Sequence, residues 1–482
     1  MNRKTLLLTV AIAGSAVIGS VIVVGVQERN LKTVKQEEIL VGNESPFITE
    51  FPVPIDDAGV NAIAADNNGL IWFIENNSSK IASFDPVIKQ FREYCMPEEI
   101  GFVWSMVVDD KNRVWFIDAE KDKLWMLDQE SKYFENFELP SKGSFPLQMA
   151  IDTIGNLWFT EFLAGNRTGN KIAKFDPVKK EFAEYRTLTP ESGPIGIDID
   201  HQGNIWFTEI GRIGVFFPSN SSFKEYEFPR PIIPPTGLVV DNDGTVWFTQ
   251  HGGNKIGKFI PSNKTLIEYS TLSLRKENPA TLPYWIKKDM HNNLWFNQHT
   301  GNRIAKFIAS NETLIEYHIP SKDIVDALTF TIDNDGNVWF TELGANKIGF
   351  VNTTMPLPFM ADASPKQVKI RPGEAAEVKL TLKNISPESY TSNLRFIATS
   401  TMTPLGKFVN ASATFSPTTV SIDEKSRQVT LLIRTEATLV PSIYKVIAGA
   451  TDGVISYLST IDLIVEKNNF GKTGSGIIET IN

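Results

Sequence analysis

The amino-acid sequence predicts an all-β protein, and three observations lead to this prediction. A Trp-Phe pair recurs seven times at intervals of 41–48 residues, each time in a short segment rich in β-branched and aromatic residues. Gly, Asn and Asp, which favour turns, separate these segments. After residue 365 the Trp-Phe pair is absent, but short segments of alternating apolar and polar residues continue. The pattern indicates two kinds of β-structure, preceded by one apolar N-terminal stretch.

The Trp-Phe repeats predict a seven-bladed β-propeller over residues 46–355, because strands repeating every 40–50 residues or so are typical of propeller blades. The fourth unit shows the expected strands: PIGIDID, IWFTE, RIGVFFP and FKEYEFP. The last unit lacks a fourth strand of this kind, and Ile48–Pro54 (ITEFPVP) matches it position by position. We therefore predict that this segment supplies the outermost strand of the last blade and closes the ring.

The adjacent Trp and Phe of each repeat are expected to face opposite sides of their strand. A large aromatic side chain at one position per blade most often packs between neighbouring sheets. The repeat tryptophans are therefore interpreted as structural. Two other tryptophans, Trp104 and Trp285, stand at the starts of first strands and are candidates for lining the central funnel.

The N-terminus predicts one transmembrane helix. Arg3 and Lys4 lie in a short cytoplasmic end (1–4), followed by 22 uncharged residues (5–26) and a polar stalk (27–45). At ~1.5 Å per residue the apolar stretch spans a hydrocarbon core of ~30 Å, and it is longer than a secretory signal core. The predicted location is the cell membrane, single-pass, with the bulk of the chain extracytoplasmic. The alternative is a protein secreted after cleavage of this segment.

The C-terminal part is predicted to be a second β-domain. A Pro-rich linker (356–365) leads to an immunoglobulin-like β-sandwich (366–466) with six or seven short alternating strands, followed by a flexible tail (467–482).

The single cysteine, Cys95, excludes an intrachain disulfide and CxxC zinc sites. The net charge of −9 argues against nucleic-acid binding, which favours a basic surface.

One polar residue follows the Trp-Phe-x triplet in every repeat, and five of the seven are carboxylates. Carboxylates that meet at a funnel could hold Ca²⁺ or Mg²⁺, or act as acid or base where crowding raises a pKa. The alternative is that they cap loops by accepting hydrogen bonds from backbone amides. The seven residues are Glu75, Asp118, Glu161, Glu209, Gln250, Gln298 and Glu342.

Two histidines follow the glutamines of this set. His251 comes after Gln250 and His299 after Gln298, in adjacent repeats (FTQHGGNKI and FNQHTGNRI). Their equivalent positions predict that they lie side by side near the mouth of the propeller. They are candidates for acid or base groups or for ligands, with loop hydrogen bonding as the alternative.

Units such as GPIGIDIDHQGNIWFTE and GLVVDNDGTVWFTQHGGNKIGKF resemble the streptogramin B lyases, the virginiamycin B lyase family, whose seven-bladed propellers repeat P-x-G-I, W-F-T-E and G-N-[KR]-I-G. The resemblance covers residues 47–352 and implies elimination-type ring opening of a cyclic depsipeptide with Mg²⁺. In that family, histidines in P-H-[AG]-I motifs at the starts of blades six and seven carry the chemistry, together with nearby carboxylates.

This chain departs from the family at both histidines, since Tyr284 and Leu328 stand in their places. Asp326 matches the acidic residue before the second histidine, Glu342 lies near the second carboxylate, and His299 could replace the lost base. The resemblance thus implies these catalytic candidates: Tyr284, His299, Asp326 and Glu342. It implies these ligands for Mg²⁺ or Ca²⁺: Asp326, Glu342, Glu161 and Glu209.

Because both family histidines are replaced, the sequence favours a membrane-anchored ligand-binding or surface-interaction protein. The expected partner is a small molecule, a cyclic peptide or a surface ligand, and the N-terminal helix provides contact with the membrane; no nucleic-acid partner is expected. The alternative is a metal-dependent carbon–oxygen lyase or a hydrolase that opens a cyclic ester, lactone or depsipeptide.

Overall fold

The computed structural model describes residues 45–165, 167–229, 231–271, 281–321, 325–385, 393–398, 411–421 and 426–467. Their regular elements are strands, apart from two 3-10 turns, η1 (His251–Gly253) and η2 (His299–Gly301), so the all-β prediction is confirmed. The chain divides into two compact units between Leu357 and Pro358, and Thr451–Ser456 belongs with the first.

The predicted membrane anchor (5–26) and the short end before it lie outside the described residues, as do all of the stalk except Ser45 and all of the tail except Lys467. In the ranges that the structure describes, no helix has the length and hydropathy needed to cross a bilayer.

The first unit contains seven successive groups of four antiparallel strands. The first three groups are β2 (Val60–Ala65), β3 (Ile71–Glu75), β4 (Lys80–Asp85) and β5 (Gln90–Cys95); β6 (Val103–Val108), β7 (Arg113–Asp118), β8 (Lys123–Asp128) and β9 (Phe134–Glu138); and β10 (Pro146–Ile151), β11 (Leu157–Ala164), β12 (Arg167–Asp176) and β13 (Glu181–Arg186). The next three are β14 (Ile197–Ile199), β15 (Ile205–Glu209), β16 (Arg212–Phe217) and β17 (Ser222–Glu227); β18 (Leu238–Val240), β19 (Val246–Gln250), β20 (Lys255–Ile260) and β21 (Thr265–Ser270); and β22 (Pro283–Lys288), β23 (Leu294–Gln298), β24 (Arg303–Ile308) and β25 (Thr313–His318).

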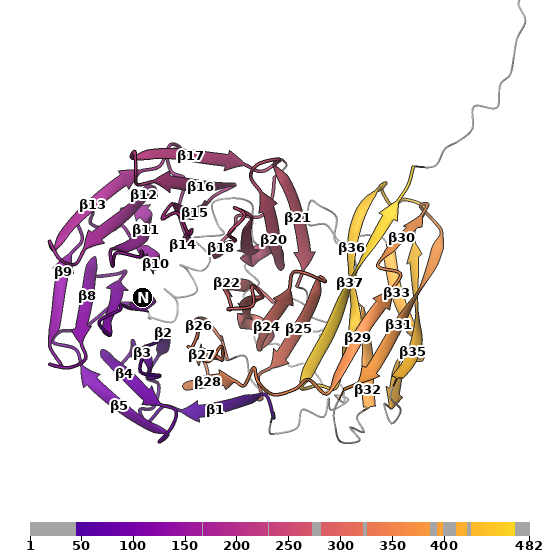
Figure 1. Ribbon diagram of the computed structural model, residues 1–482, viewed down its shortest axis with the longest axis horizontal. Coiled ribbons are helices and arrows are strands. Elements are labelled where there is room, and N and C mark those ends of the chain that lie inside the picture. The colour runs from indigo at the N-terminus through magenta and orange to yellow at the C-terminus, as the bar shows by residue number, and fades with distance from the viewer. Residues whose placement is uncertain are drawn as a thin grey trace, which may run out of the picture. The chain divides into compact units, whose positions relative to one another are not determined.

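The seventh group joins the two ends of the repeat array. It consists of β26 (Phe330–Ile332), β27 (Val338–Glu342), β28 (Lys347–Val351) and the N-terminal strand β1 (Ile48–Pro52). β1 runs antiparallel to β28, with Ile48 opposite Val351 and Pro52 opposite Lys347, which is the pairing predicted for this segment. β2 contacts β26 and β27, and Figure 1 shows the sheets of this unit following one another around a common centre. The arrangement is consistent with a propeller-like fold.

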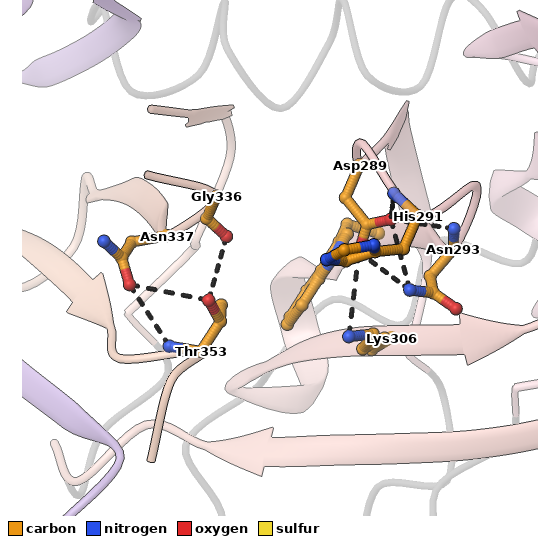
Figure 2. A network of polar contacts seen from close by, with 8 residues as sticks. Asp289, His291, Asn293, Lys306, Gly336, Asn337 and Thr353 are labelled. Atoms are coloured by element: carbon orange, nitrogen blue, oxygen red, sulfur yellow. Dashed lines mark hydrogen bonds and ion pairs between the residues drawn. The ribbon is translucent and has the colours of Figure 1, made fainter. Parts of the chain in front are cut away.

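The repeat tryptophans fix the turn between the first two strands of each sheet. In all seven sheets the indole Nε1 donates to an aspartate six residues earlier, at 2.8–3.0 Å. Figure 2 shows one such aspartate, Asp289, whose Oδ1 also accepts from the backbone N–H of His291 and of Asn293, at 2.9 Å each. In the last sheet, Thr353 Oγ1 adds a bond to the carbonyl of Gly336 in the equivalent turn, at 3.0 Å (Figure 2).

The same tryptophans fill the seams between sheets, as interpreted from the sequence. Trp206 of the fourth group, for example, packs against Leu238, Val246 and Phe248 of the fifth. Each repeat tryptophan is at most 7% exposed. Burial of one large aromatic side chain per seam supplies much of the apolar contact between neighbouring sheets.

An Ile-Gly pair recurs in the third strand of several sheets. Its glycine is needed because the phenylalanine of the Trp-Phe pair lies over it. A Cβ on Gly257 would stand 2.2 Å from the Phe248 ring, and Gly349 has the same relation to Phe340. We therefore expect Gly257→Ala to lower the free energy of unfolding by about 1–3 kcal/mol through overpacking. Gly252→Ala is the matched control, because a Cβ there would meet only Ile233 Cγ2, at 3.5 Å. Thermal unfolding of both variants measures the effect, and equal losses would contradict it.

The second unit contains two sheets. One has the strand order β29 (Phe359–Ser364), β31 (Ala375–Asn384), β35 (Ser426–Thr435) and β33 (Ala411–Ser416). In the other, the neighbours are β37 (Ile455–Val465), β36 (Ser442–Thr451), β32 (Asn393–Ala398) and β34 (Thr419–Ser421), and β30 (Gln367–Ile370) pairs in parallel with β37.

The predicted linker (356–365) needs correction, because β29 lies within it. Phe359, Ala361 and Ala363 are buried and alternate with exposed residues, as in a strand with one face on a core. The prolines nearby suggested a linker, but the alternation of buried and exposed residues determines that this segment forms a strand.

Candidate functional site

The two histidines singled out in the sequence lie side by side, as predicted. His251 begins the turn after β19, and His299 begins the equivalent turn after β23. Their Nε2 atoms are 2.7 Å apart, and the rings stack with centroids 5.0 Å apart and an interplanar angle of 8°. One imidazole must donate a proton to this hydrogen bond while the other accepts it.

Asp326 lies beside this pair, on the side of His299. Its Oδ1 lies 3.7 Å from His299 Nδ1, a distance suited to electrostatic attraction and too long for a hydrogen bond. Asp326 has a φ of 46°, in the left-handed region that non-glycine residues seldom occupy. The carboxylate favours the proton of His299 on Nδ1, which leaves its Nε2 to accept from His251.

Aromatic side chains surround the histidine pair. Tyr284 in β22 packs edge-on against His251 with centroids 5.4 Å apart, and Trp285 contacts Tyr284 at 4.5 Å. Trp104 in β6 reaches Tyr284 at 5.9 Å. Since β6 and β22 belong to the second and sixth groups, this contact crosses the centre of the unit. We name Trp104, His251, Tyr284 and His299 the aromatic–imidazole cluster.

Burial determines the charge of the cluster. Burial, assisted by the neighbouring His299, lowers the pKa of His251 to about 3, so this imidazole is neutral at physiological pH. Burial raises the pKa of Tyr284 well above its ordinary value, so its phenol stays protonated. Tyr284, one of the catalytic candidates, is therefore a hydrogen-bond donor or a packing group and cannot serve as a base near neutral pH.

The seven polar residues after the Trp-Phe-x triplets do not line a funnel. All of them are at most 1% exposed. Glu161 lies inside β11, which continues to Ala164, and the other six end the second strand of their own sheets: Glu75, Asp118, Glu209, Gln250, Gln298 and Glu342. The loop-capping alternative holds for Asp118, whose carboxylate accepts from the backbone N–H of Gly101 and of Glu120, at 2.7 and 3.1 Å.

A glutamate on the fourth strand accepts a hydrogen bond from two of these polar residues, and the sequence analysis did not predict this contact. Gln250 Nε2 donates to Glu268 at 2.7 Å, and Gln298 Nε2 donates to Glu316 at 3.0 Å. In six sheets this fourth-strand glutamate also faces a Lys or Arg of the third strand, at 2.5–3.9 Å. The recurring Glu before an aromatic residue, as in REY, AEY, KEY and IEY, was the available signal.

The carboxylic acids at the second-strand position are crowded by these partners. Burial, with a contribution from the neighbouring Glu50, raises the pKa of Glu342 to about 9. Glu50 itself accepts from Ser321 Oγ at 2.5 Å and from Lys347 Nζ at 3.2 Å. Burial likewise raises the pKa values of Glu161 and Glu209 to about 7. At neutral pH the Glu342 carboxyl is therefore protonated, whereas Glu161 and Glu209 are each protonated about half of the time.

The predicted metal ligands do not form one site. In the part of the chain that the structure describes, no three His, Cys, Asp or Glu side chains are grouped so as to hold a metal ion. Asp326 lies beside His299, whereas Glu161, Glu209 and Glu342 are buried in three different sheets. The paired Nε2 atoms face each other and not a shared centre. These residues do not fit the Mg²⁺ that the resemblance implies, and binding of Mg²⁺ or Ca²⁺ stays a prediction.

The chain is similar to solved structures over 63–64% of its length. A streptogramin B lyase structure has 26% identity and a TM-score of 0.56, covering 64% of this chain and 97% of that chain. A virginiamycin B lyase from Staphylococcus aureus has 23% identity and a TM-score of 0.56, covering 63% and 98%. A catalytically inactive variant of virginiamycin B lyase from Staphylococcus aureus, with quinupristin, has 24% identity and a TM-score of 0.55, with the same coverage. No curated protein sequence matches the chain.

A family model adds the decisive comparison, because it matches more than half of the sequence. The model describes the virginiamycin B lyase family and covers residues 30–280. The matched range includes the first five Trp-Phe repeats and His251. This chain therefore belongs to the virginiamycin B lyase family.

Proposed function

We propose that this protein is a membrane-anchored, extracytoplasmic member of its family that binds a ligand on the aromatic–imidazole cluster. In this proposal the first unit is a seven-bladed propeller closed by β1, the second is an immunoglobulin-like domain, and the apolar stretch at 5–26 is the anchor. The partner is a small molecule, a cyclic peptide or a surface ligand.

Two buried polar atoms carry this proposal. Trp104 Nε1 and His299 Nδ1 are both inaccessible to solvent and have no hydrogen-bond partner among the described residues. Buried polar groups in folded proteins are nearly always paired, and each exception calls for a partner. Tyr284 and His251 connect the two side chains through aromatic contacts, so both atoms belong to one cluster, and a ligand that separates these rings can pair with both. Aromatic walls with a few polar atoms are typical of small-molecule sites.

Binding is favoured over catalysis because the groups at the family's reactive positions are poor bases. Tyr284 and Leu328 stand where the resemblance expects histidines. The Tyr284 phenol stays protonated. A neutral imidazole with a pKa of about 3, as His251 has, accepts a proton weakly near neutral pH.

A second candidate function is ring opening of a cyclic ester, lactone or depsipeptide, and the alignment of Asp326, His299 and His251 favours it. A base held by a second group, itself oriented by a carboxylate, is the usual arrangement for proton abstraction. In the elimination, an imidazole nitrogen removes the proton α to a carbonyl, and that electron pair forms a C=C bond. The C–O bond on the β-carbon breaks, and the carboxylate leaves.

Quinupristin, the compound present with a virginiamycin B lyase, separates these candidates. The full-length protein in detergent micelles is titrated calorimetrically, and the recovered compound is analysed by chromatography and mass spectrometry. Binding with recovery of intact quinupristin supports the binding function. A product of unchanged mass but altered retention indicates elimination, and a gain of one water indicates hydrolysis. Absence of both binding and conversion would overturn the assignment of this ligand class.

A further inference from the structure

A cavity of about 600 Å³ lies in the first unit, away from the aromatic–imidazole cluster. Its walls come from the ends of β10, β14, β18, β22 and β26 and from the turns that follow some of them. The first and second strands of each sheet are antiparallel. The end of a first strand therefore lies at the opposite end of its sheet from the end of a second strand, where His251 and His299 begin their turns.

Two residues of opposite charge line this cavity at a first-strand position that is uncharged in the other sheets. The residue opposite the repeat tryptophan on the first strand occupies an equivalent position in all seven sheets. Five of these residues are uncharged: Ala64, Val107, Ala150, Val239 and Thr331. The other two are Asp198 and Lys287, on the fourth and sixth groups, and both line the cavity.

These two charges retain hydrogen-bonding capacity. The Lys287 ammonium makes no hydrogen bond or ion pair with another residue in the described ranges. The Asp198 carboxylate accepts from the backbone N–H of Val240 through Oδ2, at 2.9 Å, and two oxygens can accept more than this. By contrast, the neighbouring Lys288 is engaged with the Val240 carbonyl and with Asp241, at 3.0 and 2.9 Å.

Leaving such charges partly buried costs free energy unless a counter-charge approaches. Burial lowers the pKa of Lys287, and the Asp198 carboxylate only partly opposes that shift. Burial also raises the pKa of Asp198 despite the hydrogen bond from Val240. Both shifts are those expected of charges that still lack part of the solvation they would have in water.

We propose that this cavity binds a small aliphatic amino acid, with its carboxylate at Lys287 and its ammonium at Asp198. A zwitterion brings a carboxylate to Lys287 and an ammonium to Asp198 in one molecule. Ile151, Ile199 and Ile332 line the same cavity and provide apolar contact for the side chain. The volume lies within the range of about 300–1,000 Å³ that is usual for small-molecule sites.

Leucine is the probe for this site, and two of its derivatives are controls. Leucinamide lacks the carboxylate, and N-acetylleucine lacks the ammonium. Calorimetric titration of the full-length protein in detergent micelles is expected to show leucine binding with a Kd below about 1 mM, and at least tenfold weaker binding of either derivative. No binding of leucine, or equal binding of either derivative, would overturn the proposal.

Substitutions locate the site. Lys287→Met and Asp198→Asn are each expected to weaken leucine binding at least tenfold, whereas Lys179→Met, at an exposed position, leaves it unchanged. Lys287→Met removes a partly buried charge that makes no hydrogen bond or ion pair among the described residues, so the variant should melt at or above the temperature of the unsubstituted protein. A lower melting temperature, or unchanged leucine affinity in Lys287→Met, would contradict the assignment. Quinupristin binding at the other end of the blades is expected to persist in this variant.

Discussion

The His299→Ala substitution is expected to weaken quinupristin binding at least tenfold, a loss of about 1.4 kcal/mol. His299 supplies one of the two unpaired polar atoms of the cluster, and its ring stacks on His251 at 5.0 Å. Alanine removes both contributions. It also leaves His251 Nε2 without the partner that holds it at 2.7 Å, so the remaining imidazole loses its fixed orientation.

His291→Ala is the matched control for this substitution. His291 is exposed, and its hydrogen bond to Asp289 is made by the backbone N–H, which alanine retains. Calorimetric titration of both full-length variants compares the affinities. Equal dissociation constants for His299→Ala and His291→Ala would show that the cluster is not where quinupristin binds.

The Glu342→Gln substitution is expected to stabilise the protein at pH 8 by about 1–3 kcal/mol. Folding raises the pKa of Glu342 from an ordinary value of 4.5 to about 9, chiefly through burial and then through Glu50. Between these values the folded state holds more protons than the unfolded state, so the stability from this group is full below pH 4.5 and is lost as pH rises toward 9. Glutamine cannot ionise, so the variant loses this part of the pH dependence.

The sixth sheet already contains the arrangement that this variant would create. Gln298 Nε2 donates to Glu316 at 3.0 Å, as glutamine at 342 would donate to Glu50. The reciprocal change, Gln298→Glu, is therefore expected to steepen the fall in stability with pH. Melting temperatures at pH 5, 6.5 and 8 measure both effects. Parallel curves for Glu342→Gln and the unsubstituted protein would contradict the assigned pKa.

The sequence alone was sufficient to predict the features that follow from its repeats. Aligning the Trp-Phe units predicted the pairing of β1 with β28 and the contact of His251 with His299, because equivalent residues on adjacent sheets must lie near each other. The alignment also located the equivalent polar residue on each second strand. It did not determine the direction of that side chain, which depends on the cation of the third strand and the glutamate of the fourth.

Other features depend on the spacing and register of different sheets, which no local sequence pattern contains. Trp104 and Tyr284 touch across the centre of the unit because of the spacing of sheets that are not neighbours. The charged pair of Asp198 and Lys287 becomes visible only when all seven first strands are placed in register. In the second unit, the prolines around β29 obscured the alternation that makes it a strand.

Side-chain NMR of a histidine-labelled protein tests the central claim, that His251 and His299 contact the ligand, most directly. The chain has five histidines, so each can be assigned by single substitutions. Addition of quinupristin is expected to shift the imidazole signals of His251 and His299 and to leave those of His201, His291 and His318 in place. No shift at His251 and His299, or a shift confined to His201 in the cavity at the other end of the blades, would contradict the claim.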